Sequence, residues 1–75
     1  MDGKAEALQF NAKWDAKVLR THLKDMTLKP GILIAGLVRE AKHIIPGGDD
    51  MIFPGDKVIV LATNQRLQDL DDILL

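Results

Sequence analysis

The sequence contains no cysteine and no tyrosine, and it has only one tryptophan and two phenylalanines. Without cysteine the chain has no disulfide bonds, no thiolate ligands for a metal and no cysteine nucleophile. Neither sign of charge is in large excess: the chain has ten basic and eleven acidic residues, and its net charge is -1 at pH 7. Since no block of like charge interrupts the chain, we expect neither a nucleic-acid partner nor an anionic membrane surface.

Long apolar runs are also missing. The longest run is interrupted by Gly36 and ends at Arg39, far short of the ~20 residues needed to cross a bilayer, so we expect no direct membrane insertion. The opening residues Met1-Asp2-Gly3-Lys4 do not have the pattern of a signal peptide. The first expected strand follows them closely, and we therefore expect a domain excised from a larger protein.

What the chain does contain is typical of a folded domain. Hydrophobic residues make up 47% and charged residues 28% of it, which are values of globular rather than disordered chains. Its 75 residues suit a single domain, ordered over about residues 5–74. A chain this short buries only about 60% of the surface that its unfolded form exposes, so its core is marginal when it stands alone.

The first part of the chain predicts a strand and a helix. Residues 5–12 place Leu8 and Phe10 on one side of an alternating pattern, which indicates a strand at the edge of a sheet. Asp15 can cap a helix over about residues 16–26, where apolar residues recur at spacings of three and four.

The second part predicts three strands and a helix. The runs 32–38 and 57–63 are continuously apolar, as central strands are. Between them, residues 42–46 form a short strand that pairs back on 32–38 through a tight turn at Glu40-Ala41. A last helix is expected over residues 65–74, with leucines on its buried side.

The expected fold is a small α+β domain of the order β-α-β-β-β-α, in which two helices cover one face of one sheet. The central strands are apolar on both faces; in the first of them Ile32 and Ile34 alternate with Leu33 and Ala35. The chain has no third helix for the second face, and leaving a Val, Leu or Ile side chain in water forgoes ~1.5–3 kcal/mol. We therefore expect a homodimer, or a neighbouring domain, to cover that face.

Several short motifs follow one another in a recognisable order. Pro30-Gly31 opens an apolar strand, Arg39 ends it, the pair Ile44-Ile45 precedes Pro46, and Gly55-Asp56 precedes the last strand. In this order and spacing the motifs resemble the TrkA-C domain family, also called the RCK C-terminal domain. That family is a regulatory module of bacterial potassium-uptake subunits and of other ion transporters. The resemblance extends over about residues 5–74.

The turn after Arg39 departs from the family pattern. The family often has Asn-Gly or a similar pair there, whereas this chain has Glu40-Ala41. Because neither residue favours a positive φ, we expect a different type of turn, and the register of residues 42–46 stays open.

The resemblance implies a cytoplasmic, dimeric, ligand-sensing domain that is peripheral to a membrane transporter in the full-length protein. There it follows a Rossmann-type domain, which contacts the membrane potassium-channel subunit. No G-x-G-x-x-G occurs in these residues, so no cofactor of the Rossmann type is assigned to this chain. In some members the dimer cleft near the hairpin binds a cyclic dinucleotide. The matching positions here are Ile34, Arg39, His43, Ile45 and Pro46.

Among these residues, Arg39 is the one whose chemistry best suits an anionic ligand. It ends an apolar strand, so its guanidinium group can reach a pocket mouth and bind a phosphate or a carboxylate with two hydrogen bonds. The alternative is an ion pair with Glu40, Asp49 or Asp50. As a residue at the end of a strand, Arg39 is expected to be dispensable for the fold.

Metal binding and catalysis are not expected. Asp49, Asp50 and Asp56 flank a loop rich in Gly and Pro, but their spacing does not match a calcium-binding loop. The two histidines, His22 and His43, belong to no Ser-His-Asp or Glu-x-x-His arrangement, and both are expected to be structural. The chain is therefore not expected to be an enzyme.

The only tryptophan, Trp14, precedes the first predicted helix. We expect it to form a lid over the small core.

Two functions stay open from the sequence. The first is a ligand-sensing regulatory domain of a Trk-type potassium-uptake subunit, which acts by dimer rearrangement when a cyclic dinucleotide or another anionic nucleotide binds. The second is a purely structural dimerisation module of a transporter, without a small-molecule ligand.

Overall fold

The computed structural model describes residues 4–75, so Met1–Gly3, which carry most of the segment assessed for a signal peptide, lie outside the described residues. The elements are four strands and two short 3-10 helices. In chain order they are β1 (Ala5–Asn11), η1 (Leu23–Asp25), β2 (Ile32–Arg39), β3 (Lys42–Ile44), β4 (Lys57–Thr63) and η2 (Leu70–Ile73). The four strands that the sequence predicts are confirmed.

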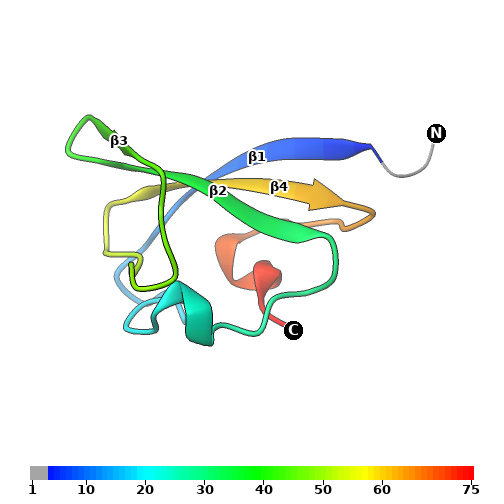
Figure 1. Cartoon of the computed structure of the whole chain (residues 1–75), viewed down its shortest axis with the longest axis horizontal. Helices are drawn as coiled ribbons and strands as arrows, with labels where there is room; N and C mark the ends of the chain where they lie inside the picture. Colours follow the sequence, from blue (N-terminus) through cyan, green and yellow to red (C-terminus); the bar gives the residue numbers. More distant parts are fainter. Residues whose placement is uncertain (1–3) are drawn as a thin grey trace.

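The strands form one antiparallel sheet with the order β1-β4-β2-β3. β1 lies at one edge, as predicted, and the short β3 lies at the other. Both 3-10 helices and the long loops lie on the same side of this sheet (Figure 1). The α+β fold with one covered sheet face is therefore confirmed.

The first predicted helix, over residues 16–26, is wrong. The chain forms turns there, Arg20 has a positive φ of 67°, and only Leu23–Asp25 make a single 3-10 turn. The backbone bonds to distant groups instead: the carboxylate of Asp71 accepts hydrogen bonds from the N–H groups of Lys17 and Val18. A helix of so few residues is marginal by itself, so tertiary hydrogen bonds can replace its internal ones.

The second predicted helix, over residues 65–74, is also wrong in extent, because only η2 is helical. Before η2 the chain is irregular, and the side-chain amide of Gln65 donates to the carbonyl of Pro30 over 2.9 Å. The helical turn starts where the carboxylate of Asp72 accepts hydrogen bonds from the N–H groups of Gln68 and Asp69, at 2.8 and 3.0 Å. Asp69 and Asp72 thus form a capping box at the start of η2.

A β-bulge in β2 decides which side chains reach the core. The pairing of β2 with β4 shifts between Ile34 and Gly36, so the alternation of side chains changes phase there. As a result Ile32 and Ile34 before the bulge lie on the same face as Leu37 and Arg39 after it. Without the bulge, Arg39 would lie on the opposite face from Ile34.

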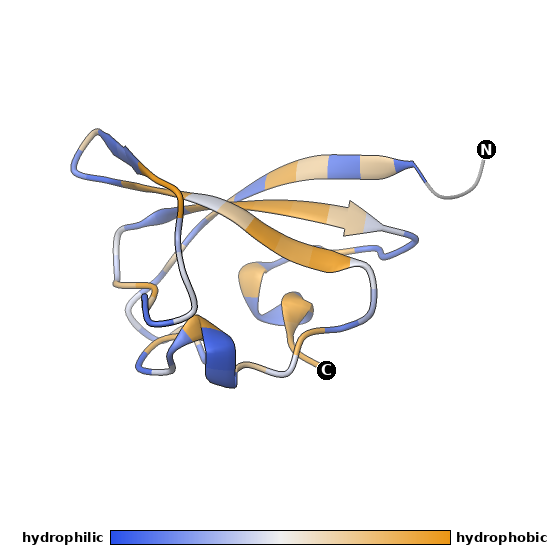
Figure 2. Cartoon of the chain, viewed as in Figure 1, coloured by the Kyte–Doolittle hydropathy of each residue, from blue (hydrophilic) through white to orange (hydrophobic). Residues whose placement is uncertain are grey.

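The core lies between the sheet and the loops beneath it. Its centre is made by residues of β2, β4 and η2 and by loop residues, all with at most a few per cent of their surface exposed: Val18, Leu37, Ile52, Val58, Val60 and Ile73. Apolar residues continue along β2 and β4 (Figure 2). The sequence and the fold therefore agree on these two strands as the centre of the sheet.

The turn between β2 and β3 has positive φ values at both central residues, 51° at Glu40 and 65° at Ala41. The expectation of a different turn type is therefore wrong. Arg39 pairs with Lys42 across the turn, which makes a two-residue hairpin of the kind that matches the twist of the strands. The hairpin thus holds two residues in a conformation that neither favours.

Within residues 4–75, no helix combines the length and the apolar character that a membrane crossing requires.

Candidate functional site

Arg39 is engaged on three sides by groups of the loop that precedes β4. Its Nε and Nη2 atoms donate to the two carboxylate oxygens of Asp56, at 2.9 and 2.7 Å, and Nη2 also donates to the carbonyl of Met51 at 3.0 Å. The guanidinium carbon lies 4.2 Å from the centre of the Phe53 ring, a distance typical of a cation–π contact. The planar guanidinium group is thus fixed in its orientation.

Asp56 is the most deeply buried charged residue of the described chain, with 1% of its surface exposed. Besides Arg39, its carboxylate accepts a hydrogen bond from the N–H of Phe53 at 2.9 Å. Burial alone would raise the pKa of Asp56, but the hydrogen bonds from Arg39 and Phe53 outweigh it and hold the pKa below its ordinary value. The same pairing raises the pKa of Arg39. Both groups are therefore charged, and the buried charge of Asp56 is compensated.

The ion-pair partners expected for Arg39, namely Glu40, Asp49 and Asp50, are wrong, because Asp56 takes that place. The expectation that Arg39 is dispensable for the fold stays a prediction, and the pairing with buried Asp56 argues against it. The sequence holds one signal for Asp56: it follows Gly55 directly and stands before a strand whose alternate residues are buried. Nothing in the sequence pairs it with a residue 17 positions away.

One nitrogen of Arg39, Nη1, has no hydrogen-bond partner among the residues that the structure describes. Arg39 also lines a small hollow of about 200 Å³ together with Glu40 and residues 53–56. Nη1 is therefore the part of the side chain that remains able to bind a ligand atom.

The other proposed ligand residues do not line the hollow beside Arg39 in the single chain. Ile34 packs against the core, and Pro46 is half-buried. His43 is exposed on the opposite face, where it pairs with Val38 across the hairpin. Ile45 follows β3 and leaves 92% of its surface exposed.

The acidic residues of the loop each have their own partner. Asp49 binds the amino group of Lys24 at 2.7 Å, Asp50 accepts a hydrogen bond from the N–H of Gly47 at 2.7 Å, and Asp56 holds Arg39. Among residues 4–75, no three His, Asp or Glu side chains gather in a way that could hold a metal ion.

The two remaining singled-out residues lie away from the core. Trp14 has 79% of its surface exposed, so the expectation that it forms a lid is wrong. His22 is half-exposed, and its Nδ1 lies 3.8 Å from the carboxylate of Asp25. His22 forms a β-bridge with Met51, the residue whose carbonyl binds Arg39.

The sheet face opposite the helices is apolar and uncovered by any described residue. Leu33 on β2 leaves 58% of its surface exposed, and it lies beside Leu61 on β4 and then Ala7 on β1 in one row across the sheet. Ile59 of β4 points to the same side, next to Gly36. Apolar side chains therefore dominate the middle of the outer sheet face, as we call this surface.

Comparison with known proteins identifies the family. The family model of the TrkA-C domain matches residues 9–75. One curated relative, "Trk system potassium uptake protein trkA homolog 1" of Methanosarcina mazei, is 28% identical over 72 residues, which are 96% of this chain and 18% of the relative. Another, "Trk system potassium uptake protein TrkA homolog" of Pyrococcus abyssi, is 34% identical over 71 residues, 93% of this chain and 31% of the relative.

Among solved structures, the one described as "Structure of RCK domain with cda" has the same fold. The TM-score is 0.67 at 21% sequence identity, over 77% of this chain and 81% of that one. The chain spans less than a third of the length of the curated relatives and most of the solved RCK domain. The order of strands, the Arg39 and Asp56 positions and the matched family model lead to one conclusion: this chain belongs to the TrkA-C domain family.

Proposed function

We propose that this domain is a ligand-sensing regulatory domain of a Trk-type potassium-uptake subunit and that it acts as a homodimer whose arrangement depends on a bound ligand. The family and the names of the curated relatives support the link to potassium uptake. In a full-length protein the domain would work in the cytoplasm, beside a Rossmann-type domain that contacts the membrane potassium-channel subunit. A change in the dimer would then shift the population of open and closed states of that assembly.

The observation that carries the proposal is the uncovered apolar face of the sheet. An exposed Leu33, in line with Leu61 and Ala7, is a surface that association would stabilise. A two-fold dimer brings the same patch of two copies together. The outer sheet face is therefore the surface on which the two copies would meet.

Sedimentation at micromolar concentration tests the dimer, with Leu33→Arg as the disrupting variant. Leu75→Arg is the matched control, because Leu75 is also exposed, at 79%, but lies at the C-terminus on the side of the loops (Figure 1). We expect a dimer for the wild type and for Leu75→Arg and a folded monomer for Leu33→Arg. A monomeric wild type with a cooperative melting transition would contradict the homodimer.

The ligand would bind where the hairpins of two copies approach each other. Ile45 and Pro46 offer apolar surface, His43 is exposed, and Arg39 keeps one nitrogen for an anionic group. Two copies present two such sets, which suits a two-fold ligand with two phosphates, such as a cyclic dinucleotide. The solved RCK domain of the same fold is described with cda, which supports this class of ligand.

A thermal-shift titration tests whether the domain binds such a ligand, with cyclic di-AMP, cyclic di-GMP, ATP and magnesium as probes. A ligand at ~100 times its dissociation constant adds ~2.7 kcal/mol of stability, which is easily measured in a domain of this size. The informative variants are His43→Ala and Ile45→Ala, since both side chains are exposed and their loss should leave the fold intact. We expect a shift with a cyclic dinucleotide in the wild type and a smaller one in both variants.

The second candidate is a structural dimerisation module without a ligand. The observation in its favour is that Asp56 and Met51 already bind two of the three nitrogens of the Arg39 guanidinium group. A stable dimer that shows no thermal shift with any of the four probes would favour this function over ligand sensing.

A further inference from the structure

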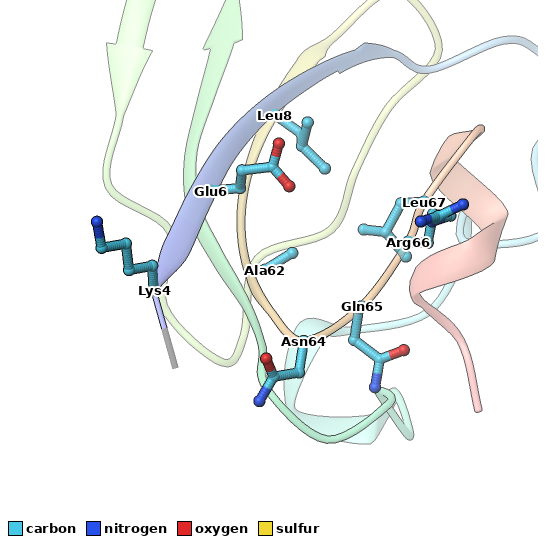
Figure 3. A pocket seen from close by; sticks show the side chains of 8 residues that line it. All are labelled: Lys4, Glu6, Leu8, Ala62, Asn64, Gln65, Arg66 and Leu67. Carbon is cyan, nitrogen blue, oxygen red and sulfur yellow. The ribbon is translucent and has the colours of Figure 1, made fainter. Parts of the chain in front are cut away.

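Two neighbouring hollows form a groove along β1, one of the two edge strands of the sheet. Its first part is a hollow of about 650 Å³ between the first half of β1 and residues 64–67. Figure 3 shows Glu6 and Leu8 on one side of this hollow and Arg66 and Leu67 on the other. A second hollow of about 540 Å³ continues it, between the end of β1 with the loop after it and residues 68–71.

The backbone along this groove has no partner strand. β1 stands at the end of the sheet order, so every second residue directs its N–H and C=O groups away from β4. Among the described residues, no backbone hydrogen bond outside the pairing with β4 involves residues 5–11. Such an edge is a template for one more strand.

The groove is lined mainly by polar surface, but a few apolar side chains in it offer packing for an added strand. Leu8 and Phe10 point to the inner side of β1 and are only half-buried, and Leu67 is half-buried opposite them. Side chains at alternate positions of an added strand would lie on this side, about two residues apart. Two apolar side chains next to Leu8 and Phe10 would complete their burial.

The two ends of the groove differ in charge. The first hollow is lined by two cationic residues, Lys4 and Arg66, and one anionic residue, Glu6. The second is lined by one cationic residue, Lys13, and three anionic ones, Asp15, Asp69 and Asp71. An added strand is therefore attracted in one orientation when its two ends carry opposite charge.

Glu6 also limits which segments can pair with the edge of β1. It is an inward-pointing charge on an edge strand, a device by which proteins prevent unspecific edge pairing. An apolar or acidic residue opposite Glu6 would be unfavourable, whereas a hydroxyl group can donate to its carboxylate. The edge is thus selective for a strand that is polar at this position.

From these features we propose that the free edge of β1 binds an extended segment of a partner protein as an additional antiparallel strand. The segment has a basic residue at its N-terminal end, over the anionic hollow, and an acidic residue at its C-terminal end, beside Lys4 and Arg66. Between them it places two apolar residues over Phe10 and Leu8 and a hydroxyl residue opposite Glu6. This interaction is independent of the outer sheet face and of the hairpin, so it stands or falls separately from the proposed function.

The probe is the capped nonapeptide Lys-Thr-Val-Thr-Val-Thr-Thr-Thr-Asp, and the control is the same peptide with Lys and Asp exchanged. Each is added to the ¹⁵N-labelled chain, and the amide shifts are followed up to millimolar concentration. We expect the probe to move the amides of residues 5–11 and 64–71 and to slow their hydrogen exchange. The control should bind roughly tenfold more weakly, since each surface ion pair contributes modestly.

Variants test the charge at the positive end. Arg66→Glu should weaken binding of the probe by roughly three- to fivefold. A peptide with Lys in place of the terminal Asp should bind this variant better than it binds the wild type. Lys42→Glu, at the exposed start of the other edge strand, should leave the affinity unchanged.

Three results would overturn the proposal. The first is no shift of β1 amides at millimolar probe, and the second is equal or tighter binding of the exchanged peptide. The third is concentration-dependent protection of residues 5–11 in the chain alone, which would make a second copy the occupant of the edge.

Discussion

At the scale of single residues, Arg39 and Asp56 form an ion pair whose carboxylate is buried. Arg39→Ala leaves the buried carboxylate of Asp56 without its partner, and breaking a buried pair in this way costs about 3–5 kcal/mol. A domain of this size has little more than that in total, so we expect Arg39→Ala to be largely unfolded in urea titrations at pH 7. Arg66→Ala, which removes an exposed arginine, should change the free energy of unfolding by no more than ~0.5 kcal/mol.

The double variant Arg39→Met/Asp56→Leu separates the effect of the two charges from the effect of side-chain packing. It removes both charges, so it should recover much of the stability that Arg39→Ala loses. If Arg39→Ala unfolds at the same urea concentration as the wild type, the ion pair has no structural role.

The Arg39–Asp56 pair also makes the free energy of unfolding depend on pH. Hydrogen bonds from Arg39 and Phe53 hold the folded pKa of Asp56 below its ordinary value of 3.8, so the unfolded chain binds more protons near that pH. The contribution of Asp56 is therefore complete well above pH 3.8 and is lost as the pH falls through the lower folded pKa. The N–H groups of Gln68 and Asp69 lower the pKa of Asp72, which acts in the same direction.

Urea unfolding at pH 7, 5, 4 and 3 measures this dependence. We expect nearly constant stability between pH 7 and 5 and a steep decrease below about pH 4. The double variant at Arg39 and Asp56 should show a shallower decrease. An equally steep decrease in that variant would assign the acid sensitivity to other carboxylates.

At the scale of elements, the hairpin between β2 and β3 carries backbone strain. Glu40 and Ala41 both have positive φ values, a region that costs a non-glycine residue about 1 kcal/mol or more. Glu40→Asn combined with Ala41→Gly supplies the residues that this turn favours. We expect a gain of about 1–2 kcal/mol in the free energy of unfolding, measured by urea denaturation.

Gly55→Ala is a control with the opposite expected effect, because it places a side chain at a positive φ in another turn, the one before β4. Gly55 has a φ of 90° with open space around the position of a Cβ atom, so only the backbone conformation opposes the alanine. A loss of about 1 kcal/mol is expected. A hairpin variant no more stable than the wild type would show that Glu40 makes a compensating interaction.

At the scale of the whole molecule, the two faces of the sheet should respond differently to the same change. Val60 of β4 is completely buried, whereas Leu33 of β2 is more than half exposed. Val60→Asp buries an unpaired carboxylate, which costs several kcal/mol and should unfold the domain. Leu33→Asp should stay folded with a nearly unchanged melting curve at low concentration, and it should weaken self-association. Equal destabilisation by both substitutions, measured by circular dichroism, would mean that the outer sheet face is part of the core.

The sequence by itself determined the four strands, their covered face and the family. Alternation of apolar residues in β1 and continuous apolar runs in β2 and β4 are local patterns, and they reflect which side chains must leave water. The positions of Arg39 and of Gly55-Asp56 are equally readable, and they carried the resemblance to the TrkA-C family that the matched family model confirms.

Only the tertiary structure decided how Arg39 is used. The bulge between Ile34 and Gly36 depends on the fit of β2 against β4, and it moves Arg39 to the core side of the sheet, where Asp56 lies. The two predicted α-helices do not form, for a related reason. The carboxylates of Asp71 and Asp72 bind backbone N–H groups of the loops, and such bonds between distant residues outweigh the weak helix preference of short segments. Local patterns decide burial, whereas the partners of charged and backbone groups are decided by contacts across the fold.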